Sequence, residues 1–135
     1  MIYLLDVNTL VALGFLQHEF HQRVAFWLRN LASKGTAELA TCSITELGFV
    51  RVLAQASQYG FTVSQARNLL IRLKSARTCT FTFLADGHDV SQLPEWVKLP
   101  KQITDGHLVN LARASGAALA TLDRKIPGAL LIPEK

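Results

Sequence analysis

Residues 2–6, Ile-Tyr-Leu-Leu-Asp, give the most direct indication of the fold. Four consecutive apolar residues without alternation are typical of a strand buried on both faces, as in a parallel sheet covered by helices. Asp6 ends the run, so we predict a strand over residues 2–5. In α/β sheets the functional crevice lies beyond the carboxyl ends of the strands, which makes Asp6 the first candidate site residue.

The rest of the chain alternates short apolar runs with longer helical patterns. Strands are predicted over 39–42, 78–83, 117–122 and 129–132. Helices are predicted over 8–16, 21–33, 44–57, 64–75 and 105–115, and the segment 85–102 is expected to be mostly loop. This alternation favours an α/β fold with a mostly parallel central sheet of four or five strands. No linker or repeat interrupts the chain, so we expect one domain over 1–135.

The composition narrows the class of protein. The chain has 135 residues, with 14 Lys and Arg against 10 Asp and Glu, a net charge of +4 that favours an anionic partner such as nucleic acid. Cys42 and Cys79 lie far apart in apolar surroundings, which is typical of reduced thiols in a cytosolic protein. No apolar stretch is long enough to cross a bilayer and the signal-peptide pattern is absent, so we expect a cytoplasmic protein with no membrane contact.

Three further carboxylates stand at the ends of predicted elements. Asp123 follows the fourth strand, Glu46 lies in the first turn after the second, and Asp105 opens the late helix. Leu108, Val109 and Ala112 continue the helical stripe that Asp105 begins, so that carboxylate should face the core. Glu46 begins a similar stripe, although a competing stripe leaves its orientation open.

Each acid also has an ordinary explanation. Asp105 suits a helix N-terminus, Glu46 would close a capping box with Ser43, and Asp6 and Asp123 suit turns after strands. Their convergence on one edge of the sheet favours a site, because clustered carboxylates are costly to ionise unless a cation neutralises them. Oxygen ligands alone indicate Mg²⁺ or Mn²⁺.

Four short motifs carry a resemblance to a known family. They are Leu5-Asp6-Val7-Asn8-Thr9-Leu10, Ser43-Ile44-Thr45-Glu46-Leu47-Gly48, Thr104-Asp105-Gly106-His107-Leu108 and Thr121-Leu122-Asp123-Arg124. In this order and spacing the chain resembles the PIN-domain nucleases, and within them the VapC toxins of bacterial toxin–antitoxin pairs. The resemblance covers essentially the whole chain. One departure is Gly106, where the family more often has Ala.

The resemblance implies a PIN-like three-layer α/β/α domain with Mg²⁺- or Mn²⁺-dependent endoribonuclease activity. It also implies a homodimer that a VapB-type antitoxin inhibits. Carried over residue by residue, it makes the metal-binding catalytic cluster Asp6, Glu46, Asp105 and Asp123. It matches the supporting polar positions to Asn8, Thr104 and Thr121.

The predicted reaction is hydrolysis of a phosphodiester bond in RNA. A metal held mainly by Asp6 and Asp105, with help from Asp123, would lower the pKa of a bound water. Glu46 would orient that water or join a second metal site, and both one ion and two stay open. Candidates for RNA contacts lie near the carboxylates in sequence, with ordinary solvated charge as the equal alternative: Arg51, Arg113, Arg124 and Lys125.

The sequence leaves two other interpretations open and fits others poorly. A non-toxin PIN-type RNA-processing nuclease, or a catalytically silent binding module of the same fold, stays open. A haloacid-dehalogenase-like phosphatase fits poorly, because Thr9 is too close to Asp6. His18 and His21 lack a third ligand and favour a surface or interface role over zinc, and His107 should point away from Asp105.

Overall fold

A five-stranded sheet forms the centre of the computed structural model, which describes residues 1–35 and 37–134. In chain order the elements are β1 (Ile2–Leu5), α1 (Val7–Gly14), α2 (His21–Ser33), β2 (Glu38–Cys42), α3 (Ser43–Gln55), α4 (Val63–Lys74), β3 (Thr80–Leu84), the short 3₁₀ helices η1 (Val90–Gln92) and η2 (Pro100–Gln102), α5 (Ile103–Ala114), β4 (Ala117–Thr121) and β5 (Leu130–Leu131). The strand order is β3-β2-β1-β4-β5 and each pairing is parallel. The predicted α/β class with a parallel sheet is therefore confirmed.

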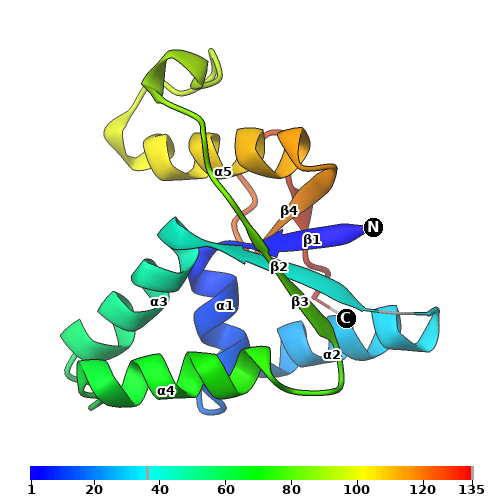
Figure 1. Cartoon of the computed structure of the whole chain (residues 1–135), viewed down its shortest axis with the longest axis vertical. Coiled ribbons are helices and arrows are strands. Elements are labelled where there is room, and N and C mark those ends of the chain that lie inside the picture. The colour runs from blue at the N-terminus through cyan, green and yellow to red at the C-terminus, as the bar shows by residue number, and fades with distance from the viewer. Residues whose placement is uncertain (36, 135) are drawn as a thin grey trace.

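Helices cover both faces of the sheet, as Figure 1 shows, with α1 to α4 on one face and α5 on the other. Consecutive strand residues point to opposite faces, so Leu5 joins the core under α1 to α4, whereas Leu4 joins the core under α5. Both side chains are fully buried. The apolar run that opens the chain is thus a central strand buried on both faces.

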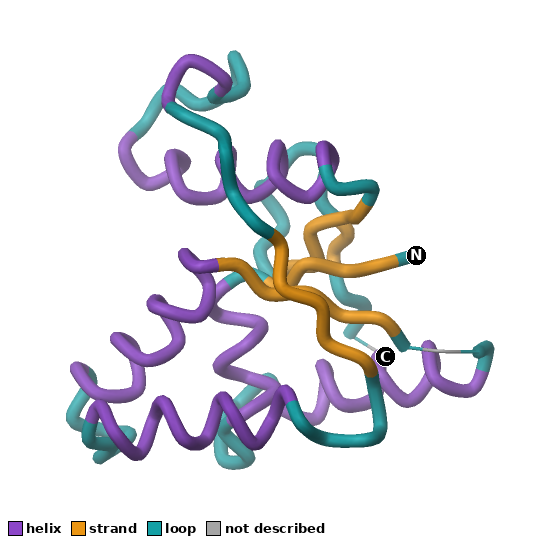
Figure 2. Tube along the Cα trace, viewed as in Figure 1, coloured by secondary structure: helices purple, strands orange, loops and turns teal. Residues whose placement is uncertain are grey.

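Local sequence signals explain where the helices begin and end. Asp6 caps α1 through its side chain, and Thr62 and Gln65 form a reciprocal capping box at the start of α4. Gly116 adopts a φ of 71° directly after α5, the left-handed conformation in which glycine commonly ends a helix. Figure 2 shows the long connection from β3 to α5 as mostly loop, as expected for the segment 85–102.

The predicted boundaries differ from the observed ones mostly by one or two residues. Helix α2 matches its predicted range of 21–33, whereas α5 begins at Ile103 because η2 leads directly into it. Asp105 is therefore the third residue of α5 and lies in its first turn, not at its start. Strand β4 ends at Thr121, so Leu122 separates it from Asp123.

The two cysteines and the two tryptophans lie outside the carboxylate motifs and contribute mainly to packing. Cys42 is buried and Cys79 half-buried, both as free thiols, and burial raises the pKa of Cys79. Trp27 is buried against Tyr3, and Trp96 packs against the core under α5 as a loop anchor. No helix within residues 1–35 and 37–134 has the length and apolar character needed to cross a membrane.

Candidate active site

Three carboxylates meet at the edge of the sheet where β1 and β4 end. Asp6 follows β1, Asp123 follows β4, and Asp105 lies in the first turn of α5. Strands β1 and β4 are parallel neighbours, with Leu5 opposite Ala120, so their carboxyl ends coincide. Asp6, Asp105 and Asp123 are called the carboxylate cluster below.

Asp6 is held firmly in place. It is 7% exposed, and its Oδ1 accepts a hydrogen bond of 2.9 Å from the backbone N–H of Thr9. Its Oδ2 accepts a hydrogen bond of 2.5 Å from the buried Thr121 hydroxyl, whose oxygen accepts the backbone N–H of Asp123 at 3.0 Å. Thr121 thus joins two members of the cluster, because its hydroxyl donates to the Asp6 carboxylate and accepts from the backbone N–H of Asp123.

Asp105 lies close enough to Asp6 and Asp123 for their charges to act on it. Burial and the negative charges of Asp6 and Asp123 raise the pKa of Asp105 to about 6. Leu108, on the same helical stripe, is buried, as the spacing predicted. A carboxyl group that ionises with difficulty among other carboxylates marks a place where a cation would be stabilised.

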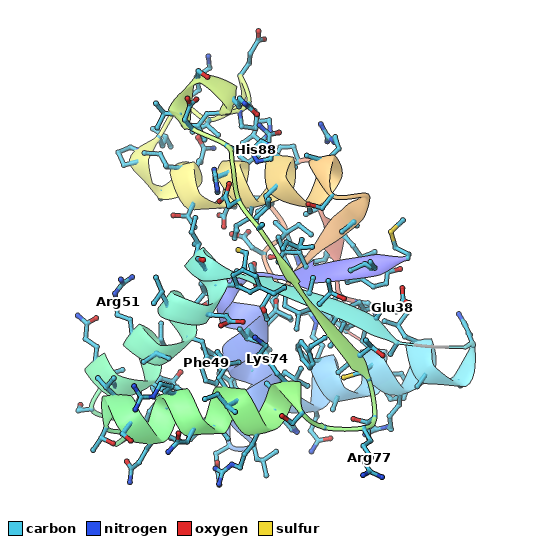
Figure 3. The ribbon with its side chains drawn as sticks, in the orientation of Figure 1. Glu38, Phe49, Arg51, Lys74, Arg77 and His88 are labelled. Carbon is cyan, nitrogen blue, oxygen red and sulfur yellow. The ribbon has the colours of Figure 1, made fainter. Side chains whose placement is uncertain are left out.

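Glu46 has different surroundings from the cluster. Its Oε2 accepts a hydrogen bond of 2.6 Å from the Thr41 hydroxyl and forms an ion pair with the Lys74 ammonium. Figure 3 shows Lys74 reaching from α4 toward the sheet, while Arg51 points outward from α3. Glu46 is not among the groups that shift the pKa of Asp105.

The capping box expected of Ser43 and Glu46 is wrong. Helix α3 begins at Ser43, so Cys42 takes the N-cap position, and its backbone N–H donates to the Thr45 hydroxyl at 3.0 Å. This leaves the Glu46 carboxylate available to Lys74. Sequence reasoning missed Lys74, because 28 residues separate the pair and only the packing of α3 on α4 brings them together.

The other predicted site residues lie around the cluster. Asn8 is exposed and lines the same cleft as Asp6, and Thr104 is exposed in the first turn of α5. Arg113 is exposed in the last turn of α5, and Arg124 and Lys125 are exposed just beyond Asp123. The Arg124 guanidinium also pairs with Glu134 at 2.6 Å.

A cleft of about 400 Å³ opens beside the cluster. Its lining includes Asp6 and Asp123, together with His18, Glu19 and Phe20 from the connection between α1 and α2. Sequence reasoning did not single out Phe20, because the connection has no motif and only the fold brings it to the site. His18 and His21 do not share a helix face, because His18 precedes α2 and His21 donates to the Ala12 carbonyl at 2.8 Å.

His107 pairs with Asp86 and so points away from Asp105, as predicted. As the side chains stand, no three Asp, Glu, His or Cys side chains within residues 1–35 and 37–134 are arranged to hold a metal ion.

Curated relatives of the chain are named ribonucleases, although no protein-family model matches the chain. Ribonuclease VapC38 of Mycobacterium tuberculosis (strain ATCC 25618 / H37Rv) is 40% identical over 125 residues, which cover 89% of this chain and 84% of the relative. Ribonuclease VapC44 of Mycobacterium tuberculosis (strain CDC 1551 / Oshkosh) is 36% identical over 130 residues, covering 91% and 87%.

Two solved structures share the fold at low sequence identity. One is VapBC2 from Rickettsia felis bound to a DNA fragment from its promoter, with a TM-score of 0.61, 18% identity and 97% of each chain covered. The other is PAE2754 from Pyrobaculum aerophilum, with a TM-score of 0.59, 20% identity, and 98% of this chain and 84% of that chain covered. Taken with the curated relatives, these findings confirm the predicted resemblance: the chain belongs to the VapC ribonuclease family.

Proposed function

We propose that this member of the VapC ribonuclease family is an Mg²⁺- or Mn²⁺-dependent endoribonuclease and the toxin of a toxin–antitoxin pair. The observation that supports it most is the convergence of Asp6, Asp105 and Asp123 at the edge of the sheet, where the charges of Asp6 and Asp123 help raise the pKa of Asp105. Each contributes only carboxylate oxygens, the donors that Mg²⁺ and Mn²⁺ prefer. In this proposal the three side chains, which are not arranged to hold an ion as they stand, turn toward a common point to bind it.

The residues of the chain would divide the work as follows. A bound Mg²⁺ or Mn²⁺ supplies a water of lowered pKa and polarises the scissile phosphate. Thr121 and the Thr9 N–H fix the two oxygens of Asp6, so this carboxylate is oriented before substrate arrives. Glu46 would orient the attacking water or join a second metal site, and Asn8 and Thr104 would support the cluster with hydrogen bonds.

The charge distribution suits an RNA substrate. If Glu46 and the cluster are set aside for the site, six acidic residues remain against 14 Lys and Arg. A basic exterior attracts the anionic strand, while the acidic centre holds the cation. In this proposal the strand is contacted by Arg113, Arg124 and Lys125.

An apolar groove between α3 and α4 supports an antitoxin partner. The groove measures about 790 Å³ and ends at the pair formed by Glu46 and Lys74. Its side chains Leu47, Val63 and Ile71 are 62%, 60% and 56% exposed, and Arg51 and Arg67 line it. These features suit an apolar segment with acidic flanks, so we assign the groove to a VapB-type antitoxin. The family resemblance adds a homodimer to the proposal, and the cysteine usage of the sequence adds a cytoplasmic location.

Purified protein tests the nuclease directly. It is expected to cut RNA with Mg²⁺ or Mn²⁺ and to stop when EDTA removes the ion. Asp6→Asn and Asp105→Asn are expected to abolish cleavage with an unchanged circular dichroism spectrum. Asp89→Asn is the matched control, because Asp89 is exposed and its side chain bonds to Ser91 in the loop before α5. Cleavage in EDTA, or full activity in either site variant, overturns the proposal.

Two further outcomes separate the alternatives. RNA that is bound but stays intact in the presence of Mn²⁺ favours a silent binding module. If the nuclease is a toxin, inducing the chain in a bacterial host arrests growth, and co-expression of a small upstream reading frame relieves the arrest. Cleavage without arrest favours an RNA-processing nuclease.

A further inference from the structure

Phe20 stands between two clefts of opposite character. The acidic cleft beside the cluster, about 400 Å³, is lined by Phe20 together with Asp6 and Asp123. A neighbouring cleft of about 640 Å³ is lined by the basic residues Arg23, Arg124 and Lys125, by Glu134, and again by Phe20, Leu122 and Asp123. A strand that passes from one cleft to the other therefore runs beside Phe20, Leu122 and Asp123, the residues that line both.

The Phe20 ring is exposed and fixed at the same time. It is 38% exposed, although a ring of this size would gain free energy from burial. Its backbone N–H donates to His18 Nδ1 at 3.0 Å, and the Arg23 guanidinium lies 5.9 Å from the ring centroid. Arg23 is itself anchored, because two of its nitrogens donate to the Ile132 carbonyl. The ring is thus flanked by Arg23 and by the His18 ring, whose centroid lies 5.8 Å away, and Phe20 lines both clefts.

We propose that Phe20 is a base-stacking residue that receives one unpaired base next to the cleaved phosphodiester. This inference rests on the proposed nuclease function and narrows its substrate to single-stranded RNA or RNA loops. Aromatic rings stack on splayed-out bases, whereas the bases of an A-form duplex are already stacked on one another. In this arrangement Arg124 and Lys125 contact the phosphate beyond the stacked base, because they line the same basic cleft.

A matched control exists on α2, the helix that Phe20 precedes. Phe26 is 36% exposed and has the Arg29 guanidinium 5.8 Å from its ring centroid, so it reproduces both the exposure and the cationic neighbour of Phe20. It lines neither of the two clefts. Phe26→Ala therefore removes the same side chain without touching the site.

The experiment measures binding separately from cleavage. Fluorescence anisotropy of a labelled random-sequence single-stranded RNA, in Ca²⁺, gives the dissociation constant, and a fully paired RNA duplex is measured in parallel. Phe20→Ala is expected to weaken single-strand binding roughly 5- to 150-fold, the loss that follows from removing one stacked base. Duplex binding is expected to stay unchanged, Phe20→Trp to retain the affinity, and Phe26→Ala to match the wild type.

Each other result rejects the inference. Single-strand affinity within twofold of wild type in Phe20→Ala, or an equal loss in Phe26→Ala, means that the ring does not stack a base. A change of oligomeric state in Phe20→Ala, seen by light scattering, assigns the ring to an interface with a second copy instead. If the wild type cuts RNA and Phe20→Ala binds single-stranded RNA like the wild type, only this inference is contradicted. If the wild type neither binds nor cuts RNA, the proposed function is contradicted as well.

Discussion

Replacing Gly106 with alanine should destabilise the protein, although alanine is the better helix former. Gly106 lies inside α5, directly after Asp105, and is buried. A Cβ at this position would lie 2.3 Å from Val97 Cγ2 and 3.3 Å from Pro94 Cδ. Val97 is β-branched and stiff about χ1, so its methyl group cannot turn aside cheaply. The segment before α5 therefore occupies the space that an alanine methyl group would need.

Two opposing terms set the size of the effect. Alanine in a helix interior gains about 1 kcal/mol over glycine. One extra methyl group in a filled space costs about 1–3 kcal/mol. We expect Gly106→Ala to lower the free energy of unfolding by about 1 kcal/mol. When Val97→Ala removes the obstructing methyl groups, the same substitution should raise it by about 1 kcal/mol, so the two sites couple by about 2 kcal/mol.

Urea unfolding of the wild type, both single variants and the double variant measures this coupling. Asn68→Ala, at an exposed position in α4, reports the gain in helix propensity without a clash. The reasoning is refuted if Gly106→Ala stabilises the protein equally with and without Val97, or if the coupling is below about 0.5 kcal/mol. In that case the only effect of Gly106 would be to lower the helix propensity of α5.

Three further predictions concern the site. In the folded, metal-free protein the Asp105 carboxyl has a pKa of about 6, against 3.8 for the free group. The free energy of unfolding therefore falls as the pH rises from 3.8 to about 6. Asp105→Asn should thus be the more stable protein at pH ~7 and lose this advantage near pH ~4 in urea titrations, and a constant difference would contradict the shift. Thr121→Val leaves Asp6 without a hydroxyl donor and should lower RNA cleavage about 10- to 100-fold, whereas Thr121→Ser, which keeps the hydroxyl, should stay near wild type. Lys74→Met should lower the free energy of unfolding by about 1 kcal/mol, because it leaves Glu46 partly buried without its ion-pair partner. An unchanged urea midpoint at low salt would show that the pair contributes nothing to stability.

The sequence predicted those features that arise from local pattern. The apolar run over residues 2–5 indicated a strand buried on both faces, and Leu4 and Leu5 lie in the cores on opposite faces of the sheet. The positions of Asp6 and Asp123 after parallel strands predicted that they meet, because such strands end at one edge. The helical spacing of Asp105 and Leu108 likewise predicted that Asp105 faces inward, and its pKa responds to the charges of Asp6 and Asp123.

Features that depend on tertiary packing could not be predicted in this way. Lys74 meets Glu46 because α4 packs against α3, and no pattern in either helix encodes that angle. Phe20 reaches the cleft through an irregular connection, where neither helical nor strand periodicity applies. The roles of Asn8 and Thr104 stay predictions, because both side chains are exposed.

The strand order has a consequence for the synthesis of the protein. Strand β1 is central, and one of its two neighbours is β4, which is synthesised after β2, β3 and α5. A chain still on the ribosome can present Asp6 long before it contains Asp105 and Asp123. The acidic centre is therefore complete only after Asp123 has been added, and a nascent chain that stops before α5 lacks two of its three carboxylates.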